Sequence, residues 1–387
     1  MNSLPAAKLH GERDGVPHAL PAWVYNHPEM TRLEIERVLK PSWQIVCHVN
    51  SIPHAGDYET LDLGPESVLV LRDRDGVIRG YHNVCRHRGA RLLDGSGNCP
   101  ATITCPYHGW SYRHDGALIG VPVRESFPGL DRSAHSLRSV RVDVSFGFVF
   151  VCLAGDPPPV SSAWGALGAE LAAYRFEDMV PLAPISTEVW NADWKVTMDN
   201  YLESYHVPIG HPGLYRMFTP DYDDQASVPG VARGISHMRD KPSSRWSERL
   251  YQTLIGRAVP HLPVAEQRSW RFYSALPNLG IDIFPDQMDF FQVLPQGPGK
   301  CMVRGTTFGL PGTSRELRAV RYLSDRINTQ VNAEDKWLCE RVQRGLASSS
   351  YTPGPLSRLE VFMQEFHDLL RERIPEIRLP QAPKQFA

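Results

Sequence analysis

Two short stretches of the sequence pair a cysteine with a histidine. They are Cys85-x-His87 and Cys105-x-x-His108, and seventeen residues separate them. Each pair lies between β-rich runs, so two loops can hold one metal centre from opposite sides. Tetrahedral zinc can take two thiolates and two imidazoles, but its sites usually keep cysteines in one half and histidines in the other. A mixed pair in each half favours a [2Fe–2S] cluster with cysteine on one iron and histidine on the other.

A second group of possible metal ligands lies in the segment DNYLESYHVPIGHPG. Glu203 and His206 are three residues apart and are expected to share one face of a helix. Pro208 and Gly210 should break that helix and let His211 fold back beside His206. Two imidazoles and one carboxylate can form a facial triad that leaves positions on ferrous iron open for O2.

The carboxylate of such a triad is expected far downstream, in NAEDKWLCERVQRGL. Asp335 would be the charged residue on an otherwise apolar helical stripe, whose other members are Leu338, Cys339, Val342 and Leu346. A buried carboxylate is costly unless it is paired or binds a metal. Glu334 is the competing choice, but it falls off the stripe. On these residues alone the alternative stays open that both histidines pack in a core and Asp335 caps or pairs.

The elements that must position these residues fall into two domains. Short β-rich runs with turn signals between them predict an all-β domain over residues 40–155. A run of prolines follows, and residues 156–387 combine several antiparallel strands with helices, among them 314–346. Residues 1–39 are expected to pack with this second domain. The predicted fold class is therefore α+β, with an antiparallel sheet covered by helices in the second domain.

The composition excludes several classes of protein. Lys and Arg number 41 against 43 Asp and Glu, so no basic field exists for nucleic acid or an anionic membrane. The most apolar stretch, 146–155, is about half of the ~20 residues that a membrane span needs. No secretory signal follows the first methionine, and seven scattered cysteines do not form a disulfide framework. We therefore expect a cytoplasmic protein.

Together the two groups of ligands resemble the α subunit of the Rieske non-haem iron oxygenases, over residues 20–375. The double Cys–His motif is similar to the Rieske motif, and His206, His211 and Asp335 are similar to the mononuclear iron ligands. The resemblance implies a Rieske [2Fe–2S] domain, a helix-grip-like catalytic domain with Fe(II), and monooxygenase or dioxygenase activity. Because the chain has no flavin or nicotinamide motif, it also implies a separate flavin and iron–sulfur reductase that takes electrons from NAD(P)H.

The resemblance further implies a homotrimer. In this family the two metal sites of one chain are too distant for fast electron transfer, and a head-to-tail trimer brings the Rieske cluster of one subunit beside the iron of the next. A carboxylate three residues before the first iron-binding histidine bridges the two sites. Glu203 occupies that position before His206, and His108 would be the other end of the bridge. Most of the family has aspartate where this chain has Glu203.

Three further segments bear on the substrate. The segments DNYLESYH, EDKWLCERVQRGLAS and LSRLEVFMQEFHDLLR resemble the branch that oxidises choline, glycine betaine and carnitine. That likeness implies hydroxylation or N-demethylation of a small quaternary amine such as a betaine, and such a cation favours an aromatic box. The candidate aromatic side chains are Phe218, Phe272, Phe290 and Phe291. Ordinary strand packing would account for each of them equally well.

Two other functions stay open on the sequence. An aromatic-ring hydroxylating oxygenase that acts on an aromatic acid would need a cation for the carboxylate, and Arg233 or Arg271 could supply it. A non-catalytic electron carrier would use only the Rieske cluster. In that case replacing His206, His211 or Asp335 would have no effect.

Overall fold

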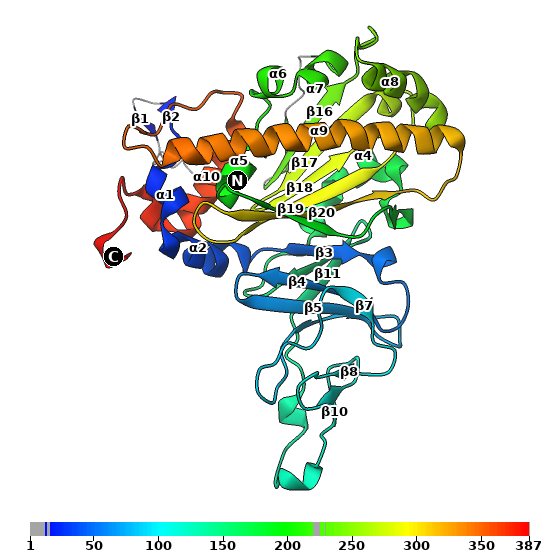
Figure 1. The fold of residues 1–387 in the computed structure, drawn as a ribbon, viewed down its shortest axis with the longest axis vertical. Helices are drawn as coiled ribbons and strands as arrows, with labels where there is room; N and C mark the ends of the chain where they lie inside the picture. The colour runs from blue at the N-terminus through cyan, green and yellow to red at the C-terminus, as the bar shows by residue number, and fades with distance from the viewer. Residues whose placement is uncertain (1–11, 14–15, 220–224, 229, 387) are drawn as a thin grey trace, which may run out of the picture. The chain divides into compact units, whose positions relative to one another are not determined.

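The computed structural model describes residues 12–13, 16–219, 225–228 and 230–386 (Figure 1). The chain forms two compact units. The β unit comprises residues 39–165 and 175–181, and the α+β unit comprises the described residues of 1–38, 166–174 and 182–387. The predicted α+β fold class is confirmed. In the described part of the chain, no helix has both the length and the apolar character that crossing a membrane would require.

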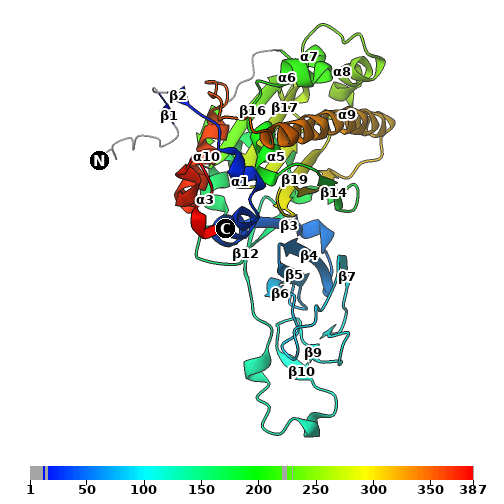
Figure 2. The same ribbon diagram turned by 60° about the vertical axis from the view of Figure 1, so that its left-hand side comes forward.

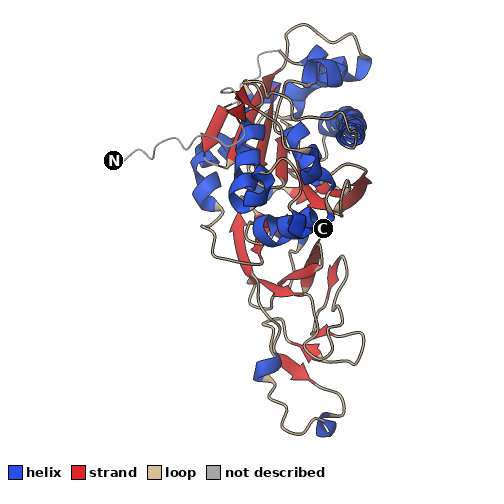
Figure 3. Cartoon of the chain, turned by 90° about the vertical axis from the view of Figure 1, so that its left-hand side faces the viewer, coloured by secondary structure: helices blue, strands red, loops and turns tan. Residues whose placement is uncertain are grey.

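The β unit consists of small antiparallel sheets joined by loops (Figure 3). The strand orders are β11-β12-β3, β6-β5-β4-β7 and β10-β9-β8. The strands are β3 (Gln44–His48), β4 (Asp57–Leu63), β5 (Glu66–Arg72), β6 (Ile78–His82), β7 (Ser96–Asn98), β8 (Ile103–Thr104), β9 (Ser111–Tyr112), β10 (Leu118–Gly120), β11 (Arg141–Ser145) and β12 (Phe148–Cys152). One apolar cluster of this unit, which includes Leu69, Trp110 and Tyr112, also contains Cys85 and Cys105. Both cysteines of the double motif are therefore anchored in a packed core.

One antiparallel sheet forms the centre of the α+β unit, in the order β20-β19-β18-β17-β16-β15, with β14 also paired to β20. The strands are β14 (Ser186–Trp190), β15 (Gln225–Val228), β16 (Val231–His237), β17 (Ser269–Ala275), β18 (Leu279–Ile283), β19 (Met288–Pro295) and β20 (Cys301–Gly309). Strands β17 to β20 follow one another along the chain, as their short apolar runs predict.

Helices cover one face of this sheet. Helix α9 (Arg315–Leu346) crosses in front of the strands (Figure 1), and α5 (Trp194–Tyr201) contacts both α9 and β19 (Figure 2). Ser314 caps α9, because its Oγ accepts a hydrogen bond from the Leu317 amide at 3.1 Å. The other α-helices near the sheet are α6 (Val207–Gly210), α7 (Pro212–Met217), α8 (Trp246–Ala258) and α10 (Val361–Arg373).

The structure corrects the predicted helix around Glu203 and His206. Helix α5 ends at Tyr201, so both residues lie in the turn that leads to α6. The break falls before Pro208 because a proline inside a helix clashes with the carbonyl group four residues earlier. The three-residue spacing still brings the two side chains together, but in a turn.

The predicted apolar stripe on α9 is wrong at Val342, which is 52% exposed. The buried residues in this part of the helix are Cys339, Gln343 and Leu346. At about 100° per residue, the centre of this buried face lies about 50° from Asp335 and about 70° from Val342 around the helix axis. Asp335 therefore lies at the edge of the buried face, and Val342 falls outside it.

Candidate metal centres and substrate cavity

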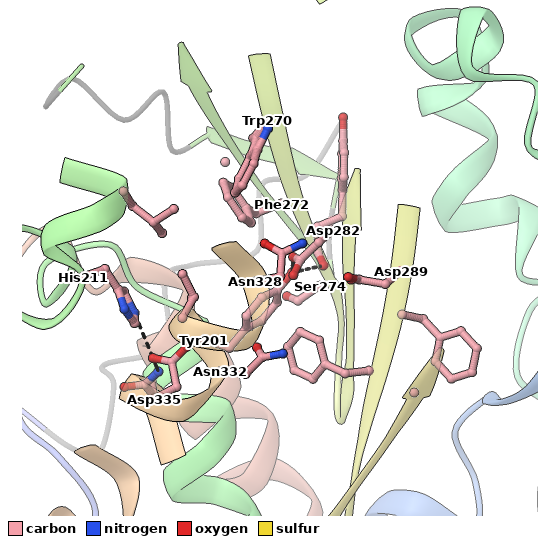
Figure 4. Close-up of a pocket in the computed structure, with 18 of the residues that line it drawn as sticks. Tyr201, His211, Trp270, Phe272, Ser274, Asp282, Asp289, Asn328, Asn332 and Asp335 are labelled. Atoms are coloured by element: carbon pink, nitrogen blue, oxygen red, sulfur yellow. Dashed lines mark hydrogen bonds and ion pairs between the residues drawn. The ribbon is translucent and has the colours of Figure 1, made fainter. Parts of the chain in front are cut away.

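Three side chains from two distant parts of the sequence converge in the α+β unit. The ligand atoms of His206, His211 and Asp335 lie within 4.8 Å of one another. The Nε2 atoms of the two histidines are 3.1 Å apart. Oδ1 of Asp335 lies 2.9 Å from Nε2 of His211 and 3.6 Å from Nε2 of His206. Figure 4 shows His211 and Asp335 at one end of a cavity, with helix α9 supplying Asp335.

Carboxylates hold both histidines at the nitrogen that faces away from this cluster. Glu203 Oε1 lies 2.5 Å from Nδ1 of His206, and Glu334 Oε2 lies 2.8 Å from Nδ1 of His211. Carboxylates at Nδ1 favour the tautomer that leaves Nε2 free to bind a metal. The structure thus distinguishes the two acidic candidates for a metal ligand. Asp335 lies beside the Nε2 atoms of both histidines, whereas Glu334 contacts only Nδ1 of His211.

The electrostatics of this cluster are strongly coupled. Burial alone would lower the pKa of His206, but hydrogen bonds to Asp335 and Glu203 outweigh it and raise the pKa to about 9. Burial acts on Asp335 in the opposite sense, and the two histidines overcome it and lower the pKa of this carboxyl group to about 2. Asn200 also donates to Oδ1 of Asp335 at 2.7 Å. A site with two imidazoles and an ionised carboxylate fits ferrous iron in a facial triad.

The two Cys–His loops of the β unit have the same backbone pattern. The amide groups of Gly89 and Gly109 each donate to the carbonyl of the cysteine four residues earlier, at 3.1 Å in both loops. Each cysteine amide in turn donates to the carbonyl five residues later, at 2.7 Å for Cys85 and 2.8 Å for Cys105. Both glycines have positive φ, 75° and 70°, which favours glycine at these turns. The two loops therefore hold Cys85 and Cys105 by the same backbone pattern.

The donor atoms of these loops fit a Rieske cluster. The rings of His87 and His108 lie 4.8 Å apart, and Nδ1 of His108 is buried without a hydrogen-bond partner in the described part of the chain. Such an atom is suited to a metal. Burial, with Cys105 nearby, raises the pKa of the Cys85 thiol, and the Tyr112 hydroxyl lies 3.3 Å from its sulfur. Hydrogen bonds to a cluster's sulfur ligands tune its reduction potential.

Comparison with known families identifies both domains. Residues 42–138 match the family described as "Rieske [2Fe-2S] domain", and residues 176–376 match "Ring hydroxylating alpha subunit (catalytic domain)". The chain belongs to the Rieske-type ring-hydroxylating oxygenase α subunits. It is therefore an oxidoreductase with a Rieske [2Fe–2S] cluster and a mononuclear iron.

Named relatives come from the quaternary-amine branch. The glycine betaine monooxygenase oxygenase subunit of Chromohalobacter salexigens is 33% identical over 92% of this chain and 85% of its own. The chloroplastic choline monooxygenase of Arabidopsis thaliana is 29% identical over 95% and 85%. The solved structure of the quaternary ammonium Rieske monooxygenase CntA with an inhibitor has a TM-score of 0.79 at 23% identity, covering 92% of this chain and 96% of that one. Naphthalene 1,2-dioxygenase from Rhodococcus, with indole bound, has a TM-score of 0.75 at 22% identity, covering 94% and 95%. These two structures establish the fold.

A cavity of about 410 Å³ lies between the iron-site cluster and the central sheet. Two rows of paired residues run across the sheet and face it. One row is Gly234, Phe272, Asp282, Asp289 and Thr307, and the other is Ala232, Ser274, Gly280, Phe291 and Gly305. The glycine at position 280 leaves room for the Phe291 ring, because a Cβ atom there would come within 2.3 Å of it. The Phe291 ring contacts the Tyr201 ring edge to face, with 4.4 Å between their centroids.

The predicted aromatic residues all line this cavity, in different ways. Phe272 and Phe291 lie on the sheet face that borders it. Phe218 is 1% exposed and packs on Trp270, with ring centroids 4.9 Å apart. Phe290 belongs to the opposite face of β19 and stacks on Phe308 at 6.1 Å. Phe272 and Phe291 are therefore best placed to meet a ligand.

The two arginines that could serve an aromatic acid are paired inside the protein. Arg271 forms ion pairs with Glu266, at 2.8 Å, and with Glu170. Arg233 also pairs with Glu170, at 2.8 Å. Only Arg233 borders the cavity. A carboxylate ligand would therefore have to compete with Glu170 for it.

The sequence interpretation missed Asp282, Asp289 and Tyr201. Tyr201 donates a hydrogen bond to Oδ1 of Asp282 at 2.7 Å. The signal was present in LGIDIFP and MDFFQ, where each aspartate interrupts an apolar strand. A charge in such a run is costly without a function or a partner.

Proposed function

We propose that this chain is the terminal oxygenase component that hydroxylates or N-demethylates a small quaternary amine. The observation that carries the proposal is the cavity beside the candidate iron site, which combines the Phe272 and Phe291 rings with the carboxylates of Asp282 and Asp289. Aromatic faces and carboxylates both attract a quaternary ammonium group. The names of the relatives support the same substrate class.

The aromatic-acid alternative has weaker support. Its substrate would need a positively charged anchor, whereas Arg233 is engaged by Glu170 at 2.8 Å. Asp282 and Asp289 would repel a carboxylate bound against the sheet. A non-catalytic electron carrier would need only the Rieske cluster, and it would not account for the convergence of His206, His211 and Asp335.

In the proposed mechanism, Cys85, His87, Cys105 and His108 would hold the Rieske cluster, which would supply one-electron transfer. His206, His211 and Asp335 would hold the mononuclear iron, which would supply positions for O2. Glu203 and Glu334 fix the orientation of the two imidazoles through Nδ1. The aromatic rings exclude water and orient one methyl group of the ammonium toward the iron.

Electron delivery requires partners. We propose a separate NAD(P)H-dependent reductase and a homotrimer in which Glu203 connects His206 with His108 of the neighbouring subunit. Glu203 supports this role because both of its carboxylate oxygens contact His206, one at Nδ1 (2.5 Å) and one at the backbone amide (3.0 Å). The glutamate thus already holds one end of the proposed bridge.

A single-turnover experiment tests the proposed function. Reduced, iron-loaded protein is mixed with ¹⁸O2 and a panel of methylated amines and aromatic acids, and products are identified by mass spectrometry. We expect a labelled or demethylated amine. A labelled aromatic acid would overturn the substrate class but keep the oxygenase assignment.

The control is Asp335→Asn, which keeps the shape of the side chain but removes its charge. We expect it to abolish turnover while the Rieske absorbance and reduction stay unchanged. Unchanged turnover in this variant would refute the assignment of Asp335 to the iron.

A further inference from the structure

Two carboxylates face each other on the wall of the cavity. Asp282 of β18 and Asp289 of β19 are direct partners in the antiparallel register. Side chains of directly opposed residues have Cβ atoms about 5 Å apart, and like charges at this position destabilise a sheet. Figure 4 shows both side chains directed into the cavity. The sheet therefore keeps an unfavourable pair where a substrate would bind.

Few charged groups are available to neutralise this pair. Among the described residues that line the cavity, Arg233 is the only arginine or lysine, and Glu170 holds it. Asp282 accepts a hydrogen bond from the Tyr201 hydroxyl at 2.7 Å. No described residue donates a hydrogen bond to the Asp289 carboxylate. Its burial and the charge of Asp282 both raise its pKa.

Other polar atoms beside the pair also lack partners. Ser274 is 1% exposed, and its Oγ has no hydrogen-bond partner among the described residues. The same holds for Nδ2 of Asn328. Ser274 comes from β17 and Asn328 from α9, and both line the same cavity as Asp282 (Figure 4). Buried polar groups are normally paired, so unpaired ones that border a cavity indicate a ligand with polar groups of its own.

We propose that Asp282 and Asp289 bind the positive charge of the substrate, and that the enzyme selects a net cation without a carboxylate group. This inference rests on the proposed function and narrows it. A choline-like substrate would place its ammonium group against the two aspartates, and its hydroxyl could pair with Ser274 or Asn328.

A betaine is disfavoured by the same geometry. Its carboxylate lies only a few bonds from its ammonium group, so both Asp282 and Asp289 would repel it. Arg233 would have to release Glu170 to receive it. A net cation meets the attraction of Asp282 and Asp289 without this competition.

Binding measurements on the intact, iron-loaded protein test the inference. Calorimetry under anaerobic conditions compares choline, glycine betaine and 3,3-dimethylbutan-1-ol, the neutral isostere of choline. We expect choline to bind about tenfold or more tightly than either of the others, because its ammonium group gains the Coulombic attraction of a carboxylate in a cavity of low dielectric constant. The isostere separates the effect of charge from that of shape.

Two isosteric variants test the residues. Asp282→Asn and Asp289→Asn each remove one negative charge, so each should weaken choline binding about 10- to 100-fold while leaving the isostere unaffected. Removing one of two like charges should leave the melting temperature unchanged or raise it. Asp286→Asn is the matched control, because Asp286 is buried in the turn between the same two strands, bonds to Tyr251 at 2.8 Å and does not line the cavity.

The outcomes are distinguishable. If glycine betaine binds and reacts at least as well as choline, and the two variants leave binding unchanged, the inference fails while the proposed function stands. A lower melting temperature with unchanged choline binding would make the aspartate pair structural and also refute it. If no methylated amine binds or reacts, the proposed function itself fails.

Discussion

Glu334 holds the imidazole of His211 at the nitrogen opposite to the candidate iron site, with Oε2 2.8 Å from Nδ1. Asp335, the next residue on α9, lies 2.9 Å from Nε2 of the same ring. Two consecutive residues of one helix therefore contact both nitrogens of one imidazole. Gln330, one turn earlier, donates to Oε1 of Glu334 at 2.9 Å and fixes its position.

We predict that Glu334→Gln weakens iron binding without removing a ligand. Outer carboxylates orient a histidine and raise its basicity, and their loss typically costs about 10- to 100-fold in metal affinity. Anaerobic Fe(II) titration would measure the change, with the Rieske absorbance as an internal reference. Glu316→Gln, an exposed change on the same helix, is the control. Equal iron affinity in both variants would contradict this role.

Glu203→Gln should separate electron transfer from metal binding. The amide can still contact His206 but carries no charge and cannot relay a proton as a carboxylate does. We expect both metals to remain bound and the reduced Rieske clusters to reoxidise at least tenfold more slowly with substrate and O2, a loss of about 1.4 kcal/mol or more in the transition state. Stopped-flow absorbance measures this rate. Reoxidation at the wild-type rate would exclude Glu203 as the bridge.

The candidate ligands could be predicted because their chemistry depends on residue type and short spacing. Mixed Cys–His pairs, and two histidines separated by a proline, restrict the choices before any fold is known. Asp335 could be selected from a distant helix because a carboxylate on a mostly buried helix face is costly unless it is paired or binds a metal. The stripe itself was only partly right, because tertiary packing decides which of several neighbouring helix faces is buried.

The pair of aspartates on the sheet face that lines the cavity could not be predicted in the same way. Asp282 and Asp289 are each visible in the sequence as a charge within an apolar strand, but their direct opposition depends on the register of β18 and β19. A shift of one residue would turn one of them to the other face. Register depends on turn geometry and on packing across the whole sheet, so composition and periodicity did not define this pair.

Lys195 makes a buried ion cluster that should stabilise the α+β unit. Its Nζ lies 2.5 Å from Oε1 of Glu34 and 2.6 Å from Oδ1 of Asp193, and the lysine side chain is fully buried. Lys195→Met would leave two buried carboxylates without their cation, which costs about 3–5 kcal/mol of unfolding free energy. Chemical denaturation would measure this loss. Lys336→Met breaks a more exposed pair with Glu188 and should cost about 1 kcal/mol or less. Similar losses in the two variants would contradict the burial argument.

Substrate affinity should depend on pH through the aspartate pair. Burial, opposed by the Tyr201 hydrogen bond and reinforced by Asp335, raises the pKa of Asp282 to about 7. Burial and the charge of Asp282 also raise the pKa of Asp289. A protonated carboxyl group has no charge for a cation, so choline affinity should fall as pH decreases below about 7, approaching tenfold per pH unit. Calorimetry between pH 6 and pH 8.5 would measure the slope, which Asp282→Asn should flatten. A pH-independent affinity in the wild-type protein would show that these carboxylates do not bind the cation.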